Sequence, residues 1–248
     1  MGARGLGMGN ATTCLQDEWS LLNNPAGLAE IKNTTTSFSY NAYPGVKAFN
    51  RMAATFTHPL KPGAAGLAVY RFGDNIYNEQ IISTGFANKF GLASIGVRIN
   101  YIQYQAEGFG SLGVVTVSMG GIATLTPQLM VGANITNINQ PEITSDNGAE
   151  TVPTRLSAAL AFRPSEKAIL CTEIEKDLAE DTLWKMGLEY QFHKNFVMRT
   201  GVNLNPQSGF LGFGCKPKRF LLDYAIQYSM LIGLNHQATV SYKFSVKK

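Results

Sequence analysis

The chain has 248 residues, of which 45% are hydrophobic and only 15% are charged. No stretch approaches the roughly 18 consecutive apolar residues that a membrane-spanning helix requires, and a net charge of +4 is too small to indicate nucleic-acid binding. Because soluble domains carry roughly 25% charged residues, the low charge and the 25 glycines are typical of a β-rich membrane or secreted protein.

The first 32 residues differ in pattern from the rest of the chain. Gly2, Gly5, Gly7 and Gly9 predict a loose opening, and the segment Met1 to Gly9 lacks the apolar core of a secretory signal. We therefore expect that a signal peptide has been removed. Closely spaced glycines also occur in dinucleotide-binding proteins, but there they follow a strand and open a βαβ unit. Neither is predicted here, so this interpretation is excluded.

A turn is predicted near the end of this first segment. The run Asn23, Asn24, Pro25, Ala26 and Gly27 combines a proline, which fixes φ, with a glycine, which permits positive φ. Two roles are open for the run: it gates or binds a ligand, or it only holds the segment in place.

From Thr34 onward the chain alternates between two faces and shows no convincing helix. In the final segment Ala238, Val240 and Tyr242 share one face, while Gln237 and Thr239 lie on the other. This period of two, with one apolar face, is what a strand between lipid and a wet lumen requires. Fourteen such segments are predicted, at residues 34–43, 48–58, 64–72, 79–89, 92–104, 112–124, 129–138, 153–163, 167–176, 182–192, 195–204, 209–216, 219–229 and 234–244.

The connecting segments alternate in character. Every second connector is short and most of these contain Pro or Lys, whereas the others, among them 72–79, 105–110, 139–152 and 177–181, tend to be longer and more acidic. Antiparallel neighbours place these two sets at opposite ends, as in outer-membrane barrels with tight periplasmic turns. Although they are the longer set, these outer loops are still small, which predicts a flat outer rim. The alternative, a soluble two-sheet sandwich, is disfavoured because Greek-key topology needs long crossovers.

The fold class predicted is therefore all-β. We expect a closed up-and-down transmembrane β-barrel of about 14 antiparallel strands, with a short N-terminal plug, in a bacterial outer membrane. Residues 1–32 are predicted to form the plug, and residues 33–248 the barrel. Outer-membrane lipid is then an obligatory partner.

Polar side chains on the inward faces would line the lumen of this barrel. They predict an ion-pair and hydrogen-bond network along the wall, and the alternative is a polar path for a ligand. The predicted network consists of Arg98, Asn100, Glu173, Lys185, Glu189, Arg199, Asp223 and Lys243.

Enzymatic and metal chemistry are not predicted. The only histidines are His58, His193 and His236, which form no arrangement with a serine and an acid, and no GxSxG motif occurs. The three cysteines are far apart and show no metal-ligand spacing. We predict a protein without catalytic residues, cofactor or metal.

Three segments near the two ends of the chain carry a resemblance to a known family: residues 2–11 (GARGLGMGNA), 17–28 (DEWSLLNNPAGL) and 233–244 (GLNHQATVSYKF). They resemble the PorV/PorQ family, which belongs to the FadL-like group of outer-membrane proteins. The resemblance implies a fourteen-stranded barrel with an N-terminal plug. It also implies a non-enzymatic accessory subunit of a type IX secretion complex in the Bacteroidetes, with a protein partner. The alternative implied by the wider group is a channel for small hydrophobic molecules, which leave through the plug and a lateral opening in the wall.

Overall fold

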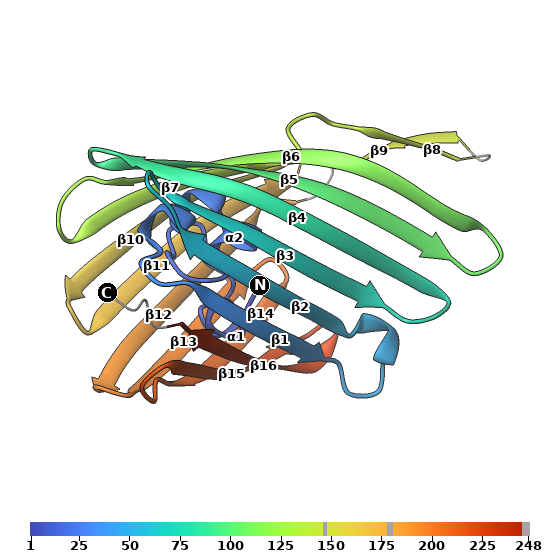
Figure 1. Ribbon diagram of the computed structural model, residues 1–248. Coiled ribbons are helices and arrows are strands. Elements are labelled where there is room, and N and C mark those ends of the chain that lie inside the picture. Colours follow the sequence, from blue (N-terminus) through green and yellow to red (C-terminus); the bar gives the residue numbers. More distant parts are fainter. Residues whose placement is uncertain (146–147, 178–180, 245–248) are drawn as a thin grey trace.

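The computed structural model describes residues 1–145, 148–177 and 181–244, and its main feature is a closed barrel of fourteen antiparallel strands (Figure 1). All fourteen strand segments predicted from the sequence are confirmed within three residues at each end. The barrel strands are β1 Thr35–Ala42, β2 Arg51–Pro59, β3 Ala64–Gly73, β4 Tyr77–Phe90, β5 Ala93–Ala106, β6 Gly110–Thr124, β7 Leu129–Thr136, β10 Arg155–Ser165, β11 Ala168–Asp177, β12 Leu183–His193, β13 Phe196–Leu204, β14 Gln207–Cys215, β15 Phe220–Ser229 and β16 Gly233–Lys243.

Each barrel strand pairs with both of its neighbours, and the first strand closes the ring against the last. β1 and β16 pair from Thr35 opposite Lys243 to Ala42 opposite His236. Closure leaves no free edge, so every strand can satisfy its backbone groups inside a bilayer. The resemblance implies a lateral opening in the wall. In the described residues, however, every barrel strand is paired with both of its neighbours.

The two faces of the wall have opposite character over most of its height. On β16, Val240 points outward and is exposed, whereas Thr239 and Ser241 point inward and are buried. Exposed apolar side chains outside and buried polar ones inside are the arrangement of an outer-membrane barrel.

Three elements precede the barrel and lie inside it: the helices α1 (Ala3–Gly7) and α2 (Ser20–Asn23), and the 3-10 helix η1 (Pro25–Glu30). The loose opening predicted from the glycines is therefore wrong for residues 3–7. Tertiary packing overrides the low helix propensity of glycine here, because a Cβ added at Gly5 would lie 2.9 Å from Thr12 and one at Gly7 would lie 3.1 Å from Gly212 of the wall. A further 3-10 turn, η2 (Lys47–Phe49), interrupts the β1–β2 connection, in which no helix was predicted.

The flat outer rim predicted from the sequence is wrong. β4, β5 and β6 have 14, 14 and 15 residues, because these strands extend into the expected connectors 72–79 and 105–110. The long connection between β7 and β10 forms a separate hairpin, β8 (Glu142–Ser145) with β9 (Gly148–Thr151). One side of the barrel consequently projects beyond the other (Figure 1). No helix among the described residues is long and apolar enough to cross a bilayer.

Candidate functional site

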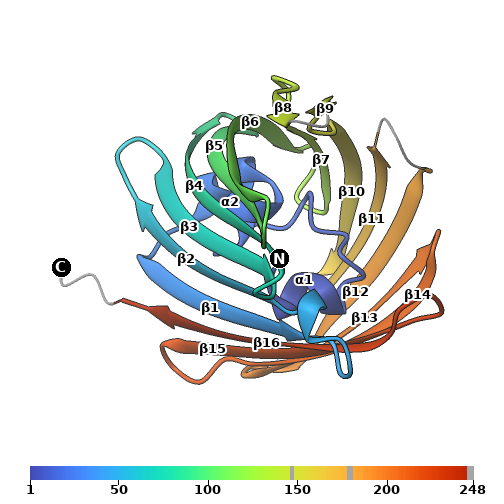
Figure 2. The ribbon, with the colours of Figure 1, turned by 90° about the vertical axis from the view of Figure 1, so that its right-hand side faces the viewer.

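The N-terminal segment fills the lumen and contacts strands on opposite sides of it. Viewed from the outer end, α1 lies against β13 to β16, and α2 and η1 lie against β3 to β6 (Figure 2). We call residues 1–32 the plug. Its contacts with the wall are the candidate site, because any molecule that crosses the lumen must pass them.

Asn24 is the central contact of the predicted turn run and is fully buried. Its amide Nδ2 donates to the carbonyl of Thr13 at 2.7 Å and lies 3.4 and 3.3 Å from the wall carbonyls of Gly121 and Ala133. Its Oδ1 accepts from the backbone N–H of Ala26 at 3.1 Å, which caps η1. One side chain thus joins two plug segments to β6 and β7.

Glycines in the wall allow this close approach of the plug. A Cβ added at Gly120 would lie 1.8 Å from Asn24 Oδ1, and one at Gly96 would lie 2.4 Å from the carbonyl carbon of Pro25. Other inward glycines meet plug atoms within about 3 Å in the same way: Gly66, Gly85, Gly132, Gly187, Gly201 and Gly212. Much of the high glycine content therefore follows from packing between plug and wall.

Arg98 on β5 holds the next segment of the plug. Its guanidinium donates to the carbonyls of Leu21 and Leu22 at 3.0 and 2.6 Å. These carbonyls lie in the last turn of α2, where a cation is favoured by the unpaired backbone acceptors. Asn100 does not touch the plug in this way. It bonds to Ser83 and Thr116 along the wall at 2.7 and 2.9 Å.

A second contact joins α1 to β12, β13 and β15 through charges. Glu189 accepts from Arg4 at 2.9 and 2.8 Å and from Arg199 at 2.6 Å. Arg199 also donates to Asp223 at 2.6 Å, and Arg4 reaches Asp17 of the plug at 3.1 Å. Because both arginines are hydrogen-bonded to carboxylates, the charges are compensated away from bulk water.

A third contact lies on β11 and β12. Lys185 donates to Glu173 at 3.0 Å and to Glu175 at 2.8 Å. Glu173 in turn accepts from the backbone N–H of Thr13 at 2.8 Å. The pair of Lys185 and Glu173 therefore also holds the plug at Thr13, whose carbonyl accepts a hydrogen bond from the Asn24 amide.

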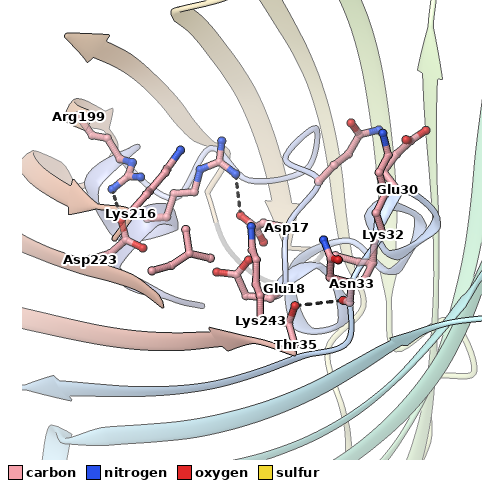
Figure 3. A pocket seen from close by; sticks show the side chains of 14 residues that line it. Asp17, Glu18, Glu30, Lys32, Asn33, Thr35, Arg199, Lys216, Asp223 and Lys243 are labelled. Carbon is pink, nitrogen blue, oxygen red and sulfur yellow. Dashed lines mark hydrogen bonds and ion pairs between the residues drawn. The ribbon is translucent and has the colours of Figure 1, made fainter. Parts of the chain in front are cut away.

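A polar cavity of about 280 Å³ remains between the plug and the wall at the inner end (Figure 3). Lys243, the last residue of the predicted lumen set, lines it together with Lys32, Lys216 and Glu18. The Glu18 carboxylate accepts from Ser241 Oγ at 3.1 Å. Burial, and then the nearby Asp17 carboxylate, raise the pKa of Glu18 to about 7.

The predicted residues thus fall into several contacts rather than one site. Arg98 and the run 23–27 lie on one side of the lumen, where Arg98 bonds to the neighbouring Leu21 and Leu22. Glu189, Arg199 and Asp223 meet on the other side. Sequence reasoning missed three plug residues, Arg4, Asp17 and Glu18. The available signal was their charge in a segment otherwise poor in charge. Among the described residues, no group of three or more side chains is suited to hold a metal ion.

The outer mouth of the lumen has a different character from its middle. Ile102 on β5 and Val114 on β6 point inward, are buried, and pack with Val152 of the long connection. Ile81, Tyr104 and Ile143 complete this cluster. On the outward face of the same level stand Gln80, Gln103 and Ser111. The apolar face of β4 to β6 therefore switches from the outside to the inside at the outer mouth, so these strands rise out of the bilayer there.

Comparison with known proteins shows a fold likeness without sequence likeness. No protein-family model matches the sequence, and no curated protein matches it. Among solved structures, the CymD monoaromatic hydrocarbon channel is 12% identical with a TM-score of 0.74, and the match covers 100% of this chain and 98% of CymD.

Two further structures are similar over nearly their whole length. The toluene transporter TodX of Pseudomonas putida is 11% identical with a TM-score of 0.72, covering 98% of this chain and 97% of TodX. A FadL homologue of Pseudomonas aeruginosa is 11% identical with a TM-score of 0.71, covering 99% and 98%. The closed barrel, its apolar outer face and these neighbours establish an outer-membrane β-barrel of the FadL-like fold.

Proposed function

We propose that this protein is an outer-membrane channel for small hydrophobic molecules, closed in the observed state by the plug. The observation that carries the proposal is the switch of polarity at the outer mouth. An inward apolar surface above the bilayer offers a hydrophobic molecule a place to leave water before it meets the polar lumen. The hydrocarbon channels among the structural neighbours support the same function.

The plug is the proposed gate. Because each wall strand pairs with both neighbours and the plug contacts strands on opposite sides of the lumen, a molecule in the outer mouth can travel further only if plug contacts break. The residues assigned to gating are the run Asn23, Asn24, Pro25, Ala26 and Gly27. Their role in transport is a proposal that rests on Asn24 joining plug and wall.

The experiment uses uptake of the hydrophobic fluorophore N-phenylnaphthylamine by intact bacterial cells that express the barrel. Ile102→Asp and Val114→Asp place charges on the inward apolar surface, and we expect each to reduce uptake several-fold. Gln103→Asp is the matched control, because Gln103 neighbours Ile102 but faces outward; it should leave uptake unchanged. Uptake no faster than in cells without the barrel contradicts the proposal.

A second function, an accessory subunit of a PorV/PorQ-like secretion complex, is favoured only by the terminal segments 2–11, 17–28 and 233–244. The solved-structure neighbours support the channel better. Purification in mild detergent from native membranes tests the second function. A stoichiometric protein partner, together with uptake unaffected by Ile102→Asp, would favour it over the channel.

A further inference from the structure

The inner end of the barrel carries a strong excess of basic side chains. The short turns there, and the strand ends beside them, bring together residues from seven separate parts of the chain. These basic residues are Lys32, Lys61, Lys89, Arg163, Lys167, Lys194, Lys216, Lys218, Arg219 and Lys243. We call them the basic collar. Eight of its members are exposed, and Lys216 and Lys243 are half-buried.

Acidic residues at the same end do not balance the collar. Within the part of the chain that the structure describes, the carboxylates beside it are Glu30 and Glu166 in the turns, and Asp17, Glu18 and Asp223 in the inner cavity. Glu30 is paired with Lys89 at 2.5 Å, Asp17 with Arg4 and Asp223 with Arg199. The outer end carries the acidic Asp74, Glu79 and Glu107 beside the basic Lys47 and Arg71. The inner end is therefore the more basic of the two, and it attracts anions.

Three collar lysines lie inside the ring of strands rather than on its rim. Lys32, Lys216 and Lys243 line the 280 Å³ cavity at the inner end of the lumen (Figure 3). Lys216 also lines a second polar cavity of about 190 Å³, together with Arg163 and Lys167. None of the three forms an ion pair within the part of the chain that the structure describes. The arginines of the same cavity differ, because Arg4 is bound to Asp17 and Arg199 to Asp223.

We propose that the basic collar is the docking surface for an acidic polypeptide segment of a periplasmic protein. Phospholipid headgroups could meet the rim residues from outside the barrel. They cannot reach the lysines of the inner cavity, which lie within the wall formed by β1, β13, β15 and β16. An extended acidic segment can contact the rim and also enter the opening. Charge complementarity of this kind contributes specificity and speeds association.

The test measures binding of a fluorescein-labelled peptide of ten glutamates to the full-length barrel in nanodiscs of phosphatidylcholine. The charge-reversal variant carries Lys32→Glu and Lys216→Glu. The matched control carries Lys47→Glu and Arg71→Glu, two exposed basic residues near the outer end. Heat-dependent gel migration confirms that both variants are folded barrels.

We expect the inner variant to bind the peptide roughly tenfold more weakly or worse, and the outer control to bind like the parent. Added salt should weaken binding by the parent and by the outer control. Equal binding by the two variants, or no binding by the parent, would overturn the proposal. A parallel arm measures association of the same proteins with vesicles containing phosphatidylglycerol. If the inner variant loses vesicle association but keeps peptide binding, the collar serves lipid and the proposal is wrong. All of these outcomes are independent of hydrophobic uptake.

Discussion

At the scale of single residues, the position of the plug depends on wall glycines, which have no side chain in its way. Gly120 faces Asn24, whose side chain is fully buried and bonded to both plug and wall. Gly120→Ala would place a methyl group where Asn24 Oδ1 lies. We expect Asn24 to lose its two wall contacts and the bond to Thr13, which weakens plug docking by about 2–4 kcal/mol. Hydrogen–deuterium exchange of residues 11–30 measures the change.

Gly121→Ala is the matched control for this prediction. Gly121 follows Gly120 on β6 but points away from the lumen, and the nearest atom to an added Cβ is 3.9 Å away. We expect its exchange to equal that of the parent protein. If Gly120→Ala also leaves exchange unchanged, the close approach is not what holds this part of the plug.

Glu189 supports the other side of the plug through two arginines. Glu189→Gln removes the charge but keeps the shape, so Arg4 and Arg199 keep one weak acceptor in place of a carboxylate. Because breaking a buried pair from one side costs about 3–5 kcal/mol, we expect faster exchange at residues 3–9. Glu166→Gln is the control, since Glu166 is exposed in an inner turn. Equal protection in both variants would show that α1 is held by packing alone.

The sequence could not predict these pairings. The alternation along the wall identifies which residues face inward, because lipid and lumen demand opposite side chains at every second position. It does not say which inward residue meets which plug residue. Arg4 and Glu189 are 185 positions apart, and no local pattern links them. Arg4 was overlooked for this reason, although Glu189 and Arg199 were identified as lumen residues.

At the scale of elements, the plug contains a group that titrates near neutral pH. Glu18 has its pKa raised from 4.5 to about 7, by burial first and by Asp17 second. Asp223 also repels its charge, while Arg4 attracts it. Below about pH 4.5 the residue is neutral whether the plug is docked or not. Between pH 4.5 and 7, Glu18 loses its proton more readily in the undocked plug than in the docked one. The free energy of docking should therefore become less favourable across this interval and remain so above it.

Trp19 reports this equilibrium because it follows Glu18 and is 1% exposed. In a Trp184→Phe background, which removes the only other tryptophan, acrylamide quenching of Trp19 should increase between pH 5 and 8. Glu18→Gln should abolish most of this increase. A pH dependence that persists in Glu18→Gln assigns the titration to another group of the same cavity.

The strands themselves were predictable, and the projecting parts were not. Strand positions follow from alternation and from turn residues, both local properties. The extra length of β4 to β6 was missed because polarity switches faces beyond Ile82 and Tyr101, so the pattern looks like a connector. The same switch forms the apolar outer mouth, with Ile102 and Val114 inside. The alternation that locates the strands therefore does not reveal the apolar outer mouth, which is the feature that supports the proposed function.

At the scale of the whole molecule, wall and plug make separable contributions. The wall is closed by its own strand pairing, and its inward side chains are mostly polar, so it can stand as a water-lined barrel once the plug is gone. The plug, by contrast, is a short segment whose helices have five and four residues and depend on the wall for their packing.

Deletion of residues 2–32 should therefore leave a folded barrel with an open lumen. We expect the deleted protein to conduct ions in planar bilayers in steps that the parent does not show, because Arg98, Lys185 and Glu189 would then face water. Heat-dependent gel migration confirms that the barrel has formed. A folded deletion variant without conductance would mean that the wall collapses or that another segment blocks the lumen, and the plug would not be the gate.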